Sequence, residues 1–176
     1  MEHLKYPIGR YNTPANFSRE IRVEGISTIE HFPRNLMLEV EHLSEEQLDT
    51  PYRPDGWTIR QVVNHCADSH MNALIRFKLA LTESTPVITP YKEALWANLA
   101  DGKDMPIHAA TLTLRGVHER WVVLLIAIKE EEWQRGYFHP EKGKVVSLAE
   151  ALGSYAWHCN HHLAHITELK KRMGWK

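Results

Sequence analysis

Four histidines lie within eight positions near the C-terminal end of the chain, in the segment YAWHCNHHLAHITEL (155–169). Histidine is the commonest protein ligand of late transition metals and the side chain that titrates nearest to neutral pH. The cluster is therefore compatible with a metal site, a proton-transfer device or a solvated polar face. The spacing of the histidines and the partners that other helices supply distinguish these three possibilities.

The histidines form two pairs at a spacing of four residues, His158 with His162 and His161 with His165. Such a pair lies on one face of an α-helix and can direct two imidazole nitrogens at one metal ion. Helical-wheel geometry predicts that the first pair borders the buried side of the helix and that the second faces solvent. Spacing alone leaves a surface position open as the alternative for the first pair, and a solvated face explains the second pair better than coordination does.

A third metal ligand has to come from another part of the chain, because catalytic zinc-type sites usually have three protein ligands. The segment NHCADSH offers His65 and His70, and His65 is preferred because it lies at the polar edge of its predicted helix. Asp68 follows His65 by one turn and is a candidate partner of that ligand. For His70, His118 and His139, a half-buried histidine that meets a carbonyl or carboxylate is the default interpretation.

The elements that must position these residues are predicted to be helices. Apolar residues recur at helical spacing over four long segments, at about 18–43, 58–82, 107–129 and 147–173. Pro33 predicts a kink or a break in the first segment. The pairs Thr58 with Gln61 and Ser147 with Glu150 fit capping boxes that open the second and fourth helices, and Gly174 is a stop signal.

The connections complete an all-α architecture. Residues 84–105 predict a long ordered crossover with one short helix at about 93–99, and the loop after residue 129 predicts two brief strands or a turn. Residues 1–17 predict an extended arm that lies over the body, followed by a single helical domain, 18–176. Two similar halves, each with a capped histidine-bearing helix, favour a four-helix bundle.

Composition limits the classes of function. The chain has 176 residues, a formal net charge of −1, and 21 basic against 22 acidic residues, so no basic field is present to attract nucleic acid or anionic lipid. No signal-peptide pattern and no apolar run long enough to cross a bilayer is found, which predicts a cytoplasmic protein. Cys66 and Cys159 lack CxxC spacing and are interpreted as reduced core thiols.

The segments GWTIRQVVNHCADSHMN and WHCNHHLAHITEL, with LDTPYR, IRFKLALTE and KRMGW, resemble the DinB/YfiT-like superfamily of bacterial four-helix metalloproteins, and in particular its YfiT-type metal-dependent hydrolases. The resemblance covers essentially the whole chain. It implies an up-down-down-up four-helix bundle and common homodimers. It also implies one divalent metal ion per subunit, zinc first and nickel second, bound by His65, His158 and His162. Asn64 departs from close relatives, which can have a second histidine there, at a position that is not a ligand.

The resemblance also implies classes of reaction. A metal held by three histidines with an open position activates water, so the first expectation is a hydrolase that acts on a small molecule, with Asp68 or His161 as candidate proton shuttle. The second is a transferase that delivers a low-molecular-weight thiol such as bacillithiol to an electrophile. The third is a metal-binding stress-response protein without catalytic activity.

Overall fold

The computed structural model of the chain describes residues 2–175, so that Met1 and Lys176, the outer ends of the predicted arm and domain, lie outside the described residues. Its framework is a bundle of long helices, as the periodicity predicted. The helices of the bundle are α2 (Arg19–Val40), α4 (Ile59–Thr82), α7 (His108–Ala127) and α8 (Leu148–Met173).

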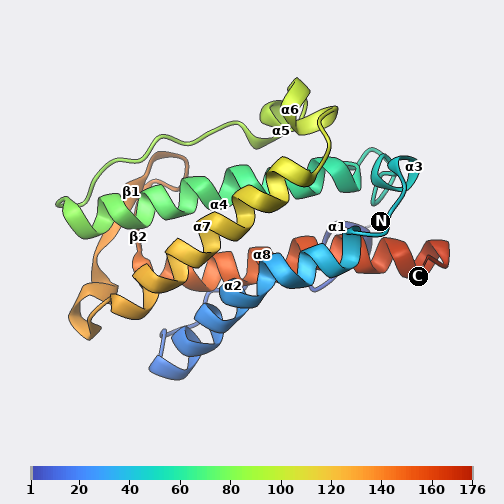
Figure 1. Cartoon of the computed structure of the whole chain (residues 1–176). Coiled ribbons are helices and arrows are strands. Elements are labelled where there is room, and N and C mark those ends of the chain that lie inside the picture. Colours follow the sequence, from blue (N-terminus) through green and yellow to red (C-terminus); the bar gives the residue numbers. More distant parts are fainter. Residues whose placement is uncertain (1, 176) are drawn as a thin grey trace.

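The direction of the four long helices confirms the up-down-down-up order. Figure 1 shows that α4 and α7 run parallel to each other and opposite to α2 and α8. Helix α2 packs against α7 and α8, and α4 packs against the same two helices from the other side. Two parallel neighbours in sequence require a long return connection. The crossover from residue 83 to 107 supplies it and carries α5 (Glu93–Trp96) and α6 (Ala100–Lys103).

Local capping explains where the helices begin and end. The Thr58 hydroxyl accepts from the Gln61 amide at 3.1 Å, and the Gln61 side chain accepts from the Thr58 amide at 3.0 Å, which confirms the capping box of α4. Ser147 caps α8 in the same way, but the Glu150 carboxylate binds Lys144 rather than the Ser147 amide, so that box is half formed. Gly174 has φ +66° and ends α8 as predicted.

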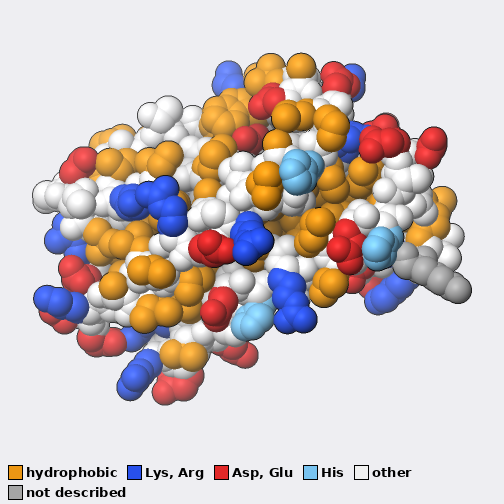
Figure 2. Space-filling model, in the orientation of Figure 1, with side chains coloured by type: hydrophobic (Ala, Val, Ile, Leu, Met, Phe, Trp, Pro, Cys, Tyr) orange, Lys and Arg blue, Asp and Glu red, His pale blue; other side chains and the backbone are white. Residues whose placement is uncertain are grey.

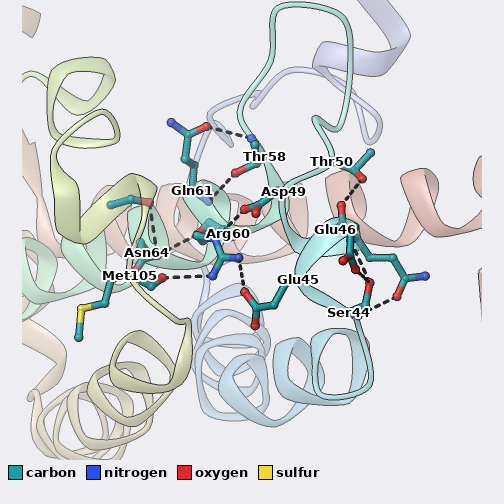
Figure 3. A network of polar contacts seen from close by, with 12 residues as sticks. Ser44, Glu45, Glu46, Asp49, Thr50, Thr58, Arg60, Gln61, Asn64 and Met105 are labelled. Atoms are coloured by element: carbon teal, nitrogen blue, oxygen red, sulfur yellow. Dashed lines mark hydrogen bonds and ion pairs between the residues drawn. The ribbon is translucent and has the colours of Figure 1, made fainter.

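A buried arginine anchors the start of α4 (Figure 3). Arg60 donates to Asp49 at 2.7 Å and to Glu45 at 2.6 Å, from the end and the beginning of α3 (Glu45–Leu48). Its third bond goes to the Met105 carbonyl at the end of the crossover. The side chain is 3% exposed, so its charge depends on these partners. Arg60 therefore ties two connections to the helix that carries His65.

Small elements close the other end of the bundle. Helix α7 is followed by η1 (Glu130–Gln134) and by an antiparallel hairpin of β1 (Gly136–His139) and β2 (Lys144–Ser147), with η2 (Pro140–Lys142) at its turn. The predicted brief strands are therefore present. Ile88, early in the crossover, donates to the Phe138 carbonyl at 3.1 Å. The hairpin thus holds the crossover beside the N-terminal end of α8.

The N-terminal arm contains one short helix, α1 (Glu2–Lys5), that its proline-rich sequence did not suggest, and it packs along α8. A Cβ atom at Gly153 of α8 would lie 2.7 Å from the Tyr11 hydroxyl and 2.8 Å from the Phe17 ring. A larger residue at position 153 would therefore force the Tyr11 and Phe17 rings to move. The aromatic rings of Tyr6 and Tyr11 lie 5.8 Å from His161 and 6.0 Å from Trp157, respectively.

The core lies between the four helices and is mainly apolar, with the buried histidines His70 and His118 within it. Its largest buried side chains are Ile29, Phe32, Leu36, Ile59, Phe77, Leu114, Trp121, Leu125, Leu148, Leu152 and Ile166. Cys66 and Cys159 are buried free thiols within it, as predicted. Among the described helices, none combines the length and the apolar character that a bilayer crossing demands.

Candidate metal centre

Three histidines from two helices converge inside the bundle. One ligand nitrogen each of His65 on α4 and of His158 and His162 on α8 lie within 4.8 Å of one another. The Nε2 atoms of His65 and His158 are 3.2 Å apart. His65 and His162 are buried, whereas His158 is half-buried and leaves one side of the cluster accessible. These three histidines are the ligands that the family resemblance implied.

Burial keeps these imidazoles neutral around pH 7. Loss of hydration lowers the pKa of His65 to about 4, and it lowers the pKa values of His158 and His162 well below the ordinary value. The positive charges of neighbouring protonated histidines would lower them further. A neutral imidazole has one unprotonated nitrogen that can bind a metal. For His158 and His162, the hydrogen bonds of the ring identify this nitrogen.

A relay of three hydrogen bonds determines which nitrogen of His158 is unprotonated. The Ile29 carbonyl can only accept, and it lies 2.6 Å from Nδ1 of His118, so the proton of His118 is on Nδ1. Nε2 of His118 then accepts from Nδ1 of His70 at 2.8 Å. Nε2 of His70 in turn accepts from Nδ1 of His158 at 3.1 Å. Nε2 of His158 is therefore left unprotonated, beside His65.

The carbonyl at the start of this relay is available because of Pro33. Within an α-helix the carbonyl of residue i accepts from the amide of residue i+4, which for Ile29 is Pro33. Proline has no amide hydrogen, so the helical acceptor site of Ile29 stays vacant. Of the kink or break predicted at Pro33, the break is absent, because α2 continues through this residue. The proline thus frees one carbonyl toward α7, where His118 lies.

A second, shorter relay fixes the proton of His162. Nε2 of His165 lies 3.1 Å from the Lys5 carbonyl and must donate to it. Nδ1 of His165 then accepts from Nδ1 of His162 at 3.4 Å, which leaves Nε2 of His162 unprotonated. Lys5 is the last residue of α1, and carbonyls at the C-terminal end of a helix have no partner within it. Each of the two proposed metal ligands on α8 is therefore oriented by a series of hydrogen bonds that ends at a backbone carbonyl without a helical partner.

The prediction that His161 and His165 face solvent is wrong. They are only 7% and 3% exposed. His165 stacks on Tyr52 with ring centroids 3.9 Å apart, and His161 stacks on Trp157 at 4.3 Å. A helical wheel places both rings away from the bundle core, and it contains no information about the N-terminal arm and the 49–57 loop, which cover that face of α8.

The default interpretation of the other histidines requires a correction as well. His70 is fully buried rather than half-buried, and its partners are two histidines rather than a carbonyl or carboxylate. His118 does meet a carbonyl, at complete burial. His139 is half-buried, with an Nδ1 atom that has no partner within residues 2–175. The signal for His70 was present in the sequence, because a histidine among apolar residues has to find a polar partner.

Asp68 does not act as the hydrogen-bond partner of His65 in this structure: among the described residues no bond joins the two side chains. The Asp68 side chain is half-buried, and desolvation with the nearby charge of Asp101 raises its pKa to about 6. The Trp57 ring lies 4.7 Å from His65 and covers it. Cys159 packs beside His70, with Sγ 4.0 Å from Nε2, and burial raises its pKa far above the ordinary value.

This combination of fold and histidine cluster defines a family. Residues 28–166 match the DinB superfamily, and the chain belongs to it. It is 47% identical to "Putative metal-dependent hydrolase YfiT" of Bacillus subtilis over 98% of this chain and 97% of that protein. A Bacillus cereus protein, also named "Putative metal-dependent hydrolase", is 48% identical over 99% of this chain and all of that protein.

The fold has a close counterpart among solved structures. The structure of YfiT from Bacillus subtilis, described as "a probable metal-dependent hydrolase with an unusual four-helix bundle topology", matches with a TM-score of 0.96. The match covers 99% of both chains at 47% identity. The resemblance that the histidine motifs indicated is therefore confirmed at the level of family and fold.

Proposed function

We propose that His65, His158 and His162 hold one divalent metal ion per subunit, zinc or nickel, and that the protein is a hydrolase of a small-molecule substrate. The observation that carries this proposal is the pair of relays that leave Nε2 of His158 and of His162 unprotonated beside His65. Hydrogen bonds that fix the free nitrogen of a ligating histidine are a regular feature of metal sites. The names of the relatives support the same class of function.

The donor set suits an ion that has to remain strongly electrophilic. When bound, a divalent ion would supply Lewis acidity and would lower the pKa of a coordinated water to about 7. Three neutral imidazoles leave the full charge of such an ion in place. His158 is half-buried and lines a cleft of about 180 Å³, which is the proposed place for a water and a substrate. Imidazole nitrogens suit both zinc and nickel.

Asp68 is the proposed proton acceptor of the reaction. It lies one turn after His65 on α4, and its pKa of about 6 is matched to proton transfer near neutral pH. His161 is less suited to this role. Burial lowers its pKa to about 4, and the Trp157 ring stacks on it at 4.3 Å. Because Asp68 forms no direct bond to His65, the proposal places a water between the carboxylate and the reacting group.

Transfer of a low-molecular-weight thiol such as bacillithiol is the second candidate function. The same open edge at His158 favours it, because a cationic centre lowers the pKa of a thiol as it does that of water. A metal-binding role without catalysis is the third. The two free buried cysteines support a reducing compartment, the cytoplasm.

The decisive experiment combines metal analysis with activity. We expect about one equivalent of zinc or nickel in the purified protein, and loss of most of it in His65→Ala, His158→Ala and His162→Ala. The control is His42→Ala, an exposed histidine just beyond α2. Turnover of esters, amides or lactones in water supports the hydrolase, whereas turnover that requires bacillithiol and a haloaromatic or epoxide supports the transferase. Metal without either reaction supports the third function, and full metal content in a variant that carries all three histidine substitutions contradicts all three functions.

We also propose that the chain forms a homodimer through the face of α2 and α7. A groove of about 760 Å³ between these helices is lined by Met37, Leu38, Leu112 and Val123. Figure 2 shows hydrophobic side chains on this face, interrupted by charged ones. A groove with exposed apolar side chains at its rim is typical of association sites.

A further inference from the structure

Arg76 is a buried cation without a carboxylate partner. Its side chain is only 8% exposed, and no carboxylate of residues 2–175 lies within ion-pair distance of it. Its two bonds go to neutral groups and are long, 3.3 Å to the Tyr155 hydroxyl and 3.4 Å to the Thr89 carbonyl. The two other similarly buried arginines, Arg22 and Arg60, both bind carboxylates at 2.7 Å or less. A desolvated guanidinium with such weak partners can still donate strong hydrogen bonds to an anion.

The guanidinium faces a cleft that also contains a proposed metal ligand. The cleft has a volume of about 180 Å³ and is bounded by α4, α8, the crossover and the β1–β2 hairpin. Hydroxyl groups line it, from Ser69, Tyr91, Tyr137, Ser154 and Tyr155, and His158 lies at one end. The Tyr155 ring contacts His158 edge-on with centroids 5.9 Å apart, and its hydroxyl binds Arg76. A molecule in this cleft can therefore touch both Arg76 and the open edge of the metal centre.

Helix geometry sets the separation of the two ends. Arg76 follows His65 by eleven residues, a whole number of turns to within about 20°, so both lie on the same face of α4. Their Cα atoms are about 16 Å apart along the axis, and the arginine side chain leans back toward the N-terminal end of the helix. Ser69 lies between them on the same face. In a substrate that spans the cleft, several bonds must consequently separate the anionic group at Arg76 from the group that reacts at the metal centre.

The charges at the mouth of the cleft decide which anion fits. The exposed residues Glu93 and Glu141 line it together with Lys142, so the acidic and basic groups, with Arg76 included, balance. A dianionic phosphate would meet two carboxylates on entry, whereas a carboxylate brings one charge and matches the planar guanidinium with two parallel hydrogen bonds. Burial and then the cations Arg76 and Lys142 lower the pKa of His139, which favours its neutral form.

We infer that Arg76 is a binding residue for the carboxylate of an elongated monocarboxylate substrate, whose other end reacts beside His158. The inference rests on the proposed function for the reaction at that other end. Binding of the carboxylate itself needs only the cleft, and it can be measured on metal-free protein. Its outcome is therefore separable from that of the metal experiment.

The test uses hexanoate as the probe, with hexanamide and butyl phosphate for comparison, on the metal-free full chain. Titration followed by ¹⁵N NMR is expected to shift the Arg76 Nε–H signal with hexanoate and to leave it unmoved with hexanamide. Arg76→Gln is expected to weaken hexanoate binding about tenfold or more, since it removes a charge-assisted bidentate contact. Arg76→Lys keeps the charge without the fork geometry and is expected to bind with intermediate affinity.

Matched controls separate this site from other causes. Arg115→Gln removes the same charge from the exposed surface of α7 and should bind hexanoate like the unmodified chain. Thermal unfolding verifies that each variant is folded. Equal hexanoate binding by Arg76→Gln overturns the inference, as does tighter binding of butyl phosphate. Hexanoate binding that appears only with zinc and is lost in His65→Ala means that the carboxylate binds the metal, which also overturns it.

Discussion

Nδ1 of His118 donates to the carbonyl oxygen of Ile29 across 2.6 Å, from α7 to α2. Neither residue contacts the proposed metal ion, yet this bond fixes the tautomer of His118, then of His70 and finally of His158. The bundle helices α2, α7, α4 and α8 each contribute one residue to this relay. The packing of the four helices therefore determines, through this series of hydrogen bonds, which nitrogen of His158 is free to bind a metal ion.

Removal of His70 should weaken metal binding without removal of a ligand. In His70→Phe the aromatic ring keeps the volume, but Nδ1 of His158 loses its acceptor. Outer partners of ligating histidines typically contribute 10–100-fold to metal affinity, so we expect a loss of about that size. Competition with a zinc chelator measures it, with His42→Phe as the exposed control. An unchanged zinc affinity would mean that the relay does not orient His158.

The N-terminal arm should contribute to metal affinity through its backbone alone. Deletion of residues 1–10 removes the Lys5 carbonyl and so frees the tautomers of His165 and His162. We expect zinc affinity to fall about tenfold or more. Lys5→Ala retains the carbonyl and should bind zinc like the unmodified chain. A loss of affinity in Lys5→Ala equal to that of the deletion would contradict the role assigned to the carbonyl.

The metal-free protein should lose stability as the pH falls below 6.5. Burial lowers the pKa of His118 to about 4 in the folded state, so between pH 6.5 and 4 the unfolded chain binds the proton first. Stability is therefore complete above pH 6.5 and declines as the pH falls through this window. At pH 5 this fully buried residue alone contributes a loss of about 2 kcal/mol.

Urea unfolding in the presence of a chelator at pH 7 and pH 5 measures this effect. His118→Phe cannot bind the proton, so its free energy of unfolding should decrease by about 2 kcal/mol less than that of the unmodified chain over this interval. Equal decreases in the two proteins would show that His118 is already accessible to protonation in the folded state.

The proposed homodimer predicts that a charge on the α2–α7 face produces monomers. Leu112 is 56% exposed and lines the groove between these helices. In Leu112→Glu, association would bury a carboxylate in an apolar contact, so the protein should sediment as a monomer at micromolar concentration. Leu95→Glu, at 61% exposure on α5, is the matched control. A sedimentation coefficient that is identical in all three proteins excludes this face as the interface.

The features that could be predicted from sequence are those set by nearby residues. The cap of α4 at Thr58, the end of α8 at Gly174 and the placement of His158 and His162 on one face of α8 follow from spacing within a turn or two, whereas His65 on α4 was chosen for its polar-edge position and by the family resemblance. The environment of His165 could not be predicted in this way. Its environment depends on Lys5 of the N-terminal arm, 160 residues earlier in the chain, and a helical wheel contains no such contact.

Pro33 illustrates a different limit. In sequence it indicates a kink or a break in a helix, and in the structure it lies inside the continuous α2. Replacement of an interior proline by alanine ordinarily stabilises a helix by up to about 3 kcal/mol. Here the new amide would compete with His118 for the Ile29 carbonyl. Pro33→Ala is therefore expected to change stability and activity in opposite directions. The helix would gain a backbone hydrogen bond, and the tautomer of His158, at the other end of the relay, would no longer be fixed.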